Sequence, residues 1–172
     1  FFEARTQKRL VDPAKVELPP YFPDHPIIRN EFANYLDAIQ LADHKVGVFL
    51  ETLQRDRVLD NSILYFFGDN GRCLIRGKQW LYETGTHVPL IVQRRDLRSA
   101  GTRRADLCSL LDVTATSLAA AGIDLPAPFH GQDLWGKQPP REFVVTARDR
   151  CGEQRDRIRA VRSNRFRYIR NF

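Results

Sequence analysis

The sequence predicts an α/β fold with a small antiparallel sheet toward its C-terminal end, on three observations. Apolar side chains recur at helical spacing from about Asn30 to Arg57, with charged residues between them. The run Ile63–Phe67 is continuously apolar, as in a strand buried on both faces of a parallel sheet. Beyond Phe143, short segments alternate between apolar residues and arginines. A helix followed by a turn and a buried strand indicates α/β architecture.

Length and composition narrow the possible classes of protein. The chain has 172 residues, of which 42% are hydrophobic, so it can bury a core and fits one domain. Its 27 Lys and Arg against 21 Asp and Glu give a net charge of +6, which favours anionic partners. It lacks zinc-finger spacing and helix-turn-helix or RNP-type signatures, so we expect no nucleic-acid partner. No apolar run approaches 18 residues, so we expect no membrane span.

The first thirty residues are rich in proline and show little periodicity, which predicts an extended surface segment. The chain contains no methionine, including at position 1. We therefore expect a processed chain or a piece of a longer one.

The turn after the predicted central strand is the first candidate site. It reads Gly68-Asp69-Asn70-Gly71, and its glycines allow positive φ and close approach of other backbone. Ligands of open α/β sheets bind beyond the carboxyl ends of the strands. The carboxylate of Asp69 and the amide oxygen of Asn70 suit Ca²⁺ or Mg²⁺ better than zinc. An ordinary reverse turn is the alternative interpretation.

A basic loop follows this turn directly. Arg72, Arg76 and Lys78 place cations beside the predicted cation site, an arrangement that suits an anionic ligand bridging to a metal. Farther along, Arg148 and Arg150 follow the predicted strand Phe143–Ala147 and could hold an anionic ligand, because guanidinium groups bind sulfate and carboxylate groups bidentately. Solvated, ion-paired surface arginines are the alternative.

Two further elements complete the predicted fold. A second helix is expected from Arg104 to Ala121, with Cys108 in its core face and Gly122 as its stop. Ile158–Ser163 and Phe166–Ile169 predict a hairpin around Asn164.

The segment FGDNGRCLIRGKQWLYETGTHVPLIVQ resembles the second half of the sulfatase catalytic domain, in the alkaline-phosphatase-like superfamily. The likeness extends to LCSLLDVTATSLAAAGI, to HGQDL and to the closing RAVRSNRFRYIRNF. Within the family the chain is most similar to bacterial heparan N-sulfatase-like enzymes. The resemblance implies a mixed sheet flanked by helices. It assigns 1–136 to the distal part of the catalytic α/β domain and 137–172 to the start of a C-terminal antiparallel subdomain, truncated at the N-terminus and at the C-terminus.

The resemblance also implies a chemistry and a set of roles. It implies a hydrolase of sulfate esters or sulfamates, acting on sulfated glycans in the periplasm or outside the cell, dependent on Ca²⁺ and on a formylglycine. Asp69 and Asn70 match the calcium ligands, and Lys78 matches the lysine that binds the sulfate. The formylglycine would lie upstream of this chain, because Cys151 has Glu153 where the modification motif needs proline or alanine. Three arginines join Lys78 as candidate substrate-binding residues because of their guanidinium chemistry and not through the resemblance: Arg72, Arg148 and Arg150.

Two other functions are open at this point. Phosphodiesterases and phosphonate hydrolases of the same superfamily typically have histidine at the position of Asn70, with zinc or manganese. A polysaccharide-binding remnant without catalysis is the second alternative. With no nucleophile in the chain, we expect little or no turnover from it alone.

Overall fold

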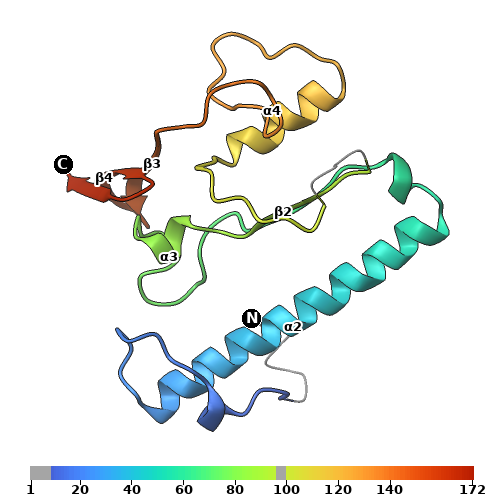
Figure 1. The fold of residues 1–172 in the computed structure, drawn as a ribbon. Helices are drawn as coiled ribbons and strands as arrows, with labels where there is room; N and C mark the ends of the chain where they lie inside the picture. The colour runs from blue at the N-terminus through green and yellow to red at the C-terminus, as the bar shows by residue number, and fades with distance from the viewer. Residues whose placement is uncertain (1–8, 96–99) are drawn as a thin grey trace. The chain divides into compact units, whose positions relative to one another are not determined.

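The computed structural model describes residues 9–95 and 100–172. The chain divides into two compact units, Phe1–Ser62 and Ile63–Phe172, each of which is described by itself. Figure 1 traces both from the N-terminus to the C-terminus.

The first unit is built on one long helix, α2, which spans Pro26–Arg55. It begins before the predicted start at Asn30, because Pro26 suits the first turn of a helix and the Nδ1 atom of His25 accepts the backbone N–H of Ile27 at 3.3 Å. After its last turn the chain reverses through Arg57, whose φ is 57°. The short 3₁₀ helix η2, Leu59–Asn61, then leads into the second unit.

The proline-rich segment is anchored on the first turns of α2. It contains the 3₁₀ helix η1, Pro13–Lys15, and runs beside the N-terminal half of α2 in Figure 1. The carboxylate of Asp37 accepts the backbone N–H groups of Leu10 and Val11 at 3.3 and 3.0 Å. The ring of Phe22 packs edge-on against Phe32, with centroids 5.1 Å apart. The described part of this segment is therefore fixed by burial and by hydrogen bonds, rather than only crossing the surface as predicted.

The predicted central strand pairs in a different way from the prediction. Strand β1, Leu64–Phe67, pairs antiparallel with β2, Leu90–Gln93. Phe66 and Phe67 are 44% and 42% exposed, so the strand is not buried on both faces. The prediction of a parallel strand is wrong within the described residues. A continuous apolar run indicates a strand, but it does not specify the direction of its partner.

The C-terminal antiparallel sheet is confirmed. It has the order β3–β4–β5, with β3 at Phe143–Cys151, β4 at Gln154–Ser163 and β5 at Arg167–Asn171. Strand β3 continues past the predicted end at Ala147 and pairs with β4 through a register shift between Arg148 and Arg150. One face buries a small apolar core whose members are Leu81, Ile158 and Ala160, with Ile169 packed against them.

Helix α4 spans Leu111–Ala120 and begins later than the predicted Arg104. The carboxylate of Asp112 accepts the N–H of Ser109 at 2.8 Å, while Ser109 Oγ accepts the N–H of Leu111 at 3.3 Å. This reciprocal cap fixes the helix start. Cys108 precedes the cap and is exposed, so its predicted place in a helical core is wrong. Gly122 follows the last turn with φ 69°, which confirms the predicted stop.

The HGQDL segment packs on α4. Buried Asp112 accepts the N–H of Gln132 at 2.7 Å and the Arg141 guanidinium at 2.5 Å, and Thr116 Oγ1 accepts the N–H of Leu134 at 2.9 Å. Helices and small sheets thus alternate along the chain, which confirms the α/β class. None of the helices within 9–95 and 100–172 combines the length and hydropathy of a membrane span.

Candidate active site

The turn after β1 is tied to the segment before β2 by backbone hydrogen bonds. The N–H of Gly68 donates to Pro89 O at 3.2 Å, and the N–H of Gly71 donates to Gly85 O at 3.0 Å. A Cβ on Gly71 would lie 1.9 Å from Thr84 O, so only glycine allows this approach. Neither Gly68 nor Gly71 uses the positive φ that glycine allows, but the close approach of other backbone is present at Gly71.

The side chain of Asn70 is oriented by a hydrogen bond that its amide nitrogen donates to the next residue. Its Nδ2 donates to the Gly71 carbonyl at 2.8 Å, which leaves Oδ1 available as an acceptor or metal ligand. The neighbouring Asp69 is exposed, and its carboxylate forms no hydrogen bond or ion pair within the described residues. Both side chains carry oxygen atoms of the kind that a hard cation prefers.

This oxygen pair is only part of a coordination shell. Ca²⁺ takes six to eight oxygen ligands. No group of three or more His, Cys, Asp or Glu side chains suited to a metal occurs in the part of the chain that the structure describes. The donors present fit calcium in chemistry, and further ligands are needed for a complete site.

The basic loop is wound tightly around one carbonyl group. Arg72 O accepts the N–H of Leu74 and the N–H of Lys78, each at 2.8 Å. A Cβ on Gly77 would lie 1.9 Å from the same carbonyl oxygen. Arg76 and Gln79 have φ of 62° and 73°, which non-glycine residues rarely adopt. The loop therefore presents the exposed Lys78 from a closely packed backbone.

Two aromatic rings follow the loop, each beside an arginine. Trp80 and Tyr82 are nearly parallel, with centroids 5.9 Å apart. The guanidinium of Arg148 lies 4.8 Å from the centroid of Trp80, and that of Arg76 lies 5.6 Å from the centroid of Tyr82. Both distances are within the range of cation–π attraction.

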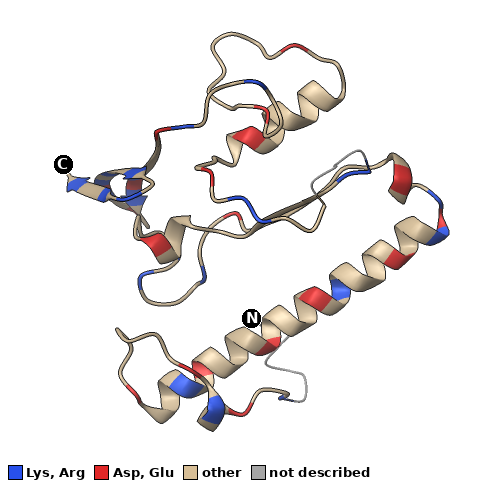
Figure 2. Ribbon diagram, in the orientation of Figure 1, with Lys and Arg blue, Asp and Glu red and all other residues tan. Residues whose placement is uncertain are grey.

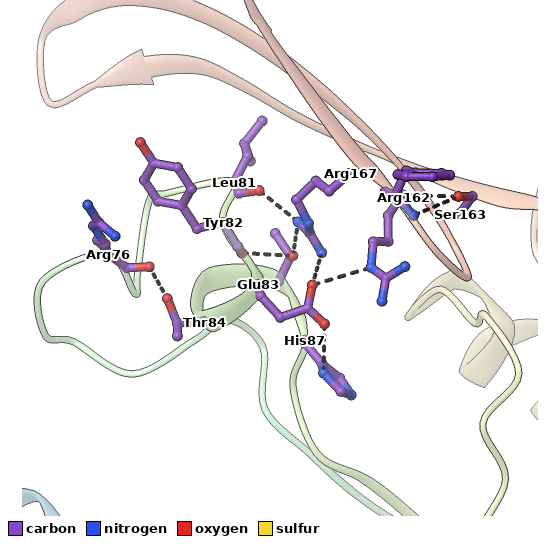
Figure 3. A network of polar contacts seen from close by, with 11 residues as sticks. Arg76, Leu81, Tyr82, Glu83, Thr84, His87, Arg162, Ser163 and Arg167 are labelled. Carbon is purple, nitrogen blue, oxygen red and sulfur yellow. Dashed lines mark hydrogen bonds and ion pairs between the residues drawn. The ribbon is translucent and has the colours of Figure 1, made fainter. Parts of the chain in front are cut away.

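Glu83 joins the short helix α3, Glu83–Thr86, to the C-terminal sheet, as Figure 3 shows. Its carboxylate pairs with Arg167 at 2.8 Å, Arg162 at 3.3 Å and His87 Nδ1 at 3.0 Å. Partial burial acts to raise the pKa of Glu83, but the charges of Arg167 and Arg162 outweigh it and hold the pKa below its ordinary value. His87 therefore contacts this network from the end of α3, with its side chain 76% exposed.

The predicted site residues fall into two groups. Asp69, Asn70, Arg72 and Lys78 lie in one continuous stretch that two backbone hydrogen bonds hold together, Gly71 to Gly85 and Lys78 to Arg72. Arg148 and Arg150 lie inside β3 rather than beyond its end.

The two arginines of β3 differ in exposure. The Arg148 side chain is 8% exposed, and it donates to Gln79 O at 2.7 Å and pairs with Asp156. Arg150 is exposed near the end of the strand, opposite Arg155. The basic residues of β3, β4 and β5 are all arginines, and Figure 2 shows basic residues in blue on the C-terminal sheet.

Sequence reasoning did not find the ion-pair network. Glu83 lies within the motif L-Y-E-x-G, but its arginine partners are about 80 residues away in the chain. Alternation in the last strands indicated which residues face outward, not what they contact. No local pattern connects the two segments.

The described residues thus combine a mixed α/β fold, a candidate oxygen pair for a cation and an exposed lysine in the loop that follows it. The sequence model of the Sulfatase family matches residues 3–123. The chain belongs to the sulfatase family.

Curated relatives agree with this assignment. The ulvan-active sulfatase of Formosa agariphila is 34% identical over 99% of this chain and 29% of its own length. The human N-sulphoglucosamine sulphohydrolase is 32% identical over 67% of this chain and 23% of its own length. The human N-acetylgalactosamine-6-sulfatase is 34% identical over 54% of this chain and 20% of its own length. The chain therefore spans less than a third of each of these relatives.

Proposed function

We propose that this chain supplies part of the active site of a sulfatase that hydrolyses sulfate esters or sulfamates of a sulfated glycan. One observation carries the proposal. The oxygen pair of Asp69 and Asn70 and the lysine of the basic loop belong to a single hydrogen-bonded unit, in which Gly71 donates to Gly85 O at 3.0 Å and Lys78 donates to Arg72 O at 2.8 Å. A metal-bound sulfate needs a cation close to it to neutralise its charge, and this unit supplies candidate residues for both roles.

Asp69 and Asn70 are proposed to hold Ca²⁺. Bound there, the ion would supply Lewis-acid stabilisation of the charge on the sulfuryl oxygens. The hydrogen bond from Asn70 Nδ2 to Gly71 O supports this role, because it fixes the amide plane with Oδ1 free to coordinate. The formylglycine and the other calcium ligands would come from residues outside this chain.

Lys78 is proposed to bind the sulfate group directly and to act as a catalytic residue. Its backbone is fixed at Arg72 O, while its side chain remains exposed. Arg72 begins the same loop and is proposed to bind the substrate beside it, and exposed Arg150 is proposed to contact the sugar at a greater distance. For Arg148, by contrast, the contacts favour a role inside the protein.

The main alternative is a phosphodiesterase or phosphonate hydrolase of the same superfamily. An amide oxygen at Asn70 favours calcium, whereas a zinc or manganese enzyme gains more from a nitrogen ligand. A polysaccharide-binding protein without catalysis is the second alternative. We also propose that the protein works in the periplasm or outside the cell, where sulfated glycans are available.

The test is turnover by the full-length protein after metal removal and replacement. We expect calcium, and not zinc, to restore release of sulfate from sulfated oligosaccharides. Zinc-dependent cleavage of phosphodiesters without sulfate release would favour the phosphodiesterase. Binding of the sulfated glycan with no release under any metal would favour the non-catalytic alternative.

Two substitutions connect the test to this site. Lys78→Met should lower kcat about 100-fold, the usual cost of removing one electrostatic contact to a transition state. Lys137→Met removes an exposed lysine outside the loop and should change little. Equal effects of both substitutions would remove Lys78 from the site.

A further inference from the structure

Three arginines of the C-terminal sheet hold the segment that follows Lys78. Arg148 in β3 donates to Gln79 O at 2.7 Å, and Arg167 in β5 donates to Leu81 O at 2.7 Å. Arg162 in β4 pairs with Glu83 at 3.3 Å. Figure 3 shows Arg162 and Arg167 converging on Glu83, with Arg167 also reaching Leu81 O. The segment 79–83 is thus bound to the sheet at alternate residues.

The sheet also holds this segment through apolar contact. The Leu81 side chain is buried in a cluster with Ile158 and Ala160 of β4, against which Ile169 of β5 packs. Residues of β4, in the middle of the C-terminal sheet, and of β5, at its edge, therefore support the end of the loop. This anchoring joins parts of one unit that lie about 80 residues apart in the chain.

Of the three arginines, Arg148 contacts the residue nearest to Lys78 in the chain, because it binds Gln79, which directly follows the lysine. Its guanidinium uses one nitrogen for Gln79 O, another for the carboxylate of Asp156, and its face for the ring of Trp80 at 4.8 Å. Only a planar cation with several donors makes these three contacts together. With its side chain 8% exposed, Arg148 has little surface left for a substrate.

The backbone around Lys78 explains why such an anchor matters. Lys78 is fixed on its N-terminal side by the hydrogen bond from its own N–H to Arg72 O at 2.8 Å. On its C-terminal side, Gln79 adopts φ 73°, a left-handed conformation that is costly for a residue with a side chain and persists only where its surroundings hold it. Strand β3 holds this residue by two contacts: the Arg148 guanidinium donates to the backbone Gln79 O at 2.7 Å, and Cys151 Sγ lies 3.9 Å from Oε1 of the Gln79 side chain. Only the first of these fixes the backbone.

We propose that Arg148 is a positioning residue: it holds Gln79 and Trp80 so that the Lys78 ammonium group points at the anionic group of the substrate. The proposal rests on the proposed sulfate-binding role of Lys78. In this role Arg148 does not contact the sugar directly, as the sequence had suggested, but acts through the backbone of the loop. The C-terminal sheet then serves the active site as the support of its lysine.

The experiment compares Arg148→Met, Arg148→Lys and Arg157→Met in the full-length protein. Arg157 lies on β4 with an exposed side chain and serves as the matched control. Hydrogen exchange of the Lys78 amide, followed by mass spectrometry with residue resolution, reports whether the loop opens. In Arg148→Met we expect exchange at Lys78 to accelerate by about tenfold or more, while the amides of the β4–β5 pairing keep their protection.

Kinetics on a sulfated oligosaccharide form the second readout. Arg148→Met should lower kcat more than it raises KM, because a displaced lysine loses more contact with the transition state than with the bound substrate. Arg148→Lys should recover little of the loss, since an ammonium group cannot both stack on Trp80 and hold two partners. Arg157→Met should match the unmodified protein in both readouts.

The two readouts separate this proposal from the proposed function. Unchanged exchange at Lys78 in Arg148→Met would overturn the positioning role, whatever the activity. A rise in KM alone, with normal exchange, would return Arg148 to direct substrate binding. If exchange accelerates but Lys78→Met has full activity, then the sulfate-binding role of Lys78 is wrong, and the positioning proposal that rests on it is overturned too.

Discussion

Arg167 and Glu83 form an ion pair of 2.8 Å that joins β5 to α3, although 84 positions separate them in the chain. The same guanidinium donates to Leu81 O at 2.7 Å and to Thr86 Oγ1 at 2.6 Å. One arginine thus holds the start and the end of the short helix beside the basic loop. Because the pKa of Glu83 is lowered in the folded protein, the contribution of this contact can be measured from how stability changes with pH.

Replacing Glu83 by Gln should remove part of the acid sensitivity of the protein. The pKa of Glu83 is lowered from 4.5 because the charges of Arg167 and Arg162 outweigh the effect of partial burial. A carboxyl whose pKa falls on folding adds stability that is present above pH 4.5 and lost as pH falls through the folded-state pKa. Since the side chain is 49% exposed, we expect a contribution on the order of 0.5 kcal/mol.

Urea denaturation between pH 5 and pH 3 measures this contribution. The free energy of unfolding should fall less steeply with acid in Glu83→Gln than in the unmodified protein. Glu153→Gln, which removes an exposed carboxyl in the turn before β4, is the control. If Glu83→Gln and the unmodified protein have equal slopes, the ion pairs of Glu83 do not contribute to stability.

Gly85→Ala should destabilise the loop strongly. A Cβ at this position would lie 1.9 Å from Trp80 O and 2.5 Å from Gly77 O, and neither backbone atom can move without opening the basic loop. We expect a loss of about 2–3 kcal/mol in the free energy of unfolding. Gly47→Ala is the matched control, because nothing lies within 4 Å of its Cβ and alanine favours the helix by about 0.5–1 kcal/mol. Equal midpoints of chemical denaturation for the two variants would contradict the packing described for the loop.

Asp112→Asn should unfold the region around α4. The carboxylate is 2% exposed, and it pairs with the guanidinium of Arg141 and caps the helix at Ser109. Removing its charge leaves Arg141, whose side chain is 18% exposed, without its charged partner, at a cost of about 3–5 kcal/mol for a buried pair. Asp106→Asn breaks the exposed pair with Arg104 and should cost less than about 1 kcal/mol. Thermal denaturation of both variants gives the comparison, and similar losses would show that burial of Asp112 has no energetic effect.

Calcium should raise the thermal stability of the full-length protein through Asp69. A ligand that binds only the folded state at 100 times its dissociation constant adds about 2.7 kcal/mol. Asp69→Ala should lose this gain without losing stability in the absence of metal, because the carboxylate has no partner within the described residues. Asp124→Ala, an exposed carboxylate after α4, should keep the gain. A calcium-induced rise that is as large in Asp69→Ala would exclude Asp69 as a ligand.

Part of the geometry of the candidate site could be inferred from the sequence, and the rest could not. The turn at Asp69 and Asn70 and the loop at Lys78 form a continuous stretch, so their proximity could be inferred from their order in the chain. The surroundings of Arg148 could not, because its partners Gln79 and Trp80 lie about 70 residues away. A strand pattern places a side chain on a face and leaves open whether that face meets solvent, substrate or another loop.

By itself, the sequence determined the elements whose causes are local. Helix α2 follows from apolar spacing, the end of α4 from Gly122, and the hairpin around Asn164 from alternation on both sides of a turn. The serine and aspartate at the start of α4 were also readable, as the capping pattern S-x-x-D, although the predicted helix began earlier. Tertiary structure alone decided the antiparallel partner of β1 and the arginines that converge on the basic loop. Both depend on contacts between distant residues, whose free energy comes from burial and charge pairing and not from the conformational preference of any one segment.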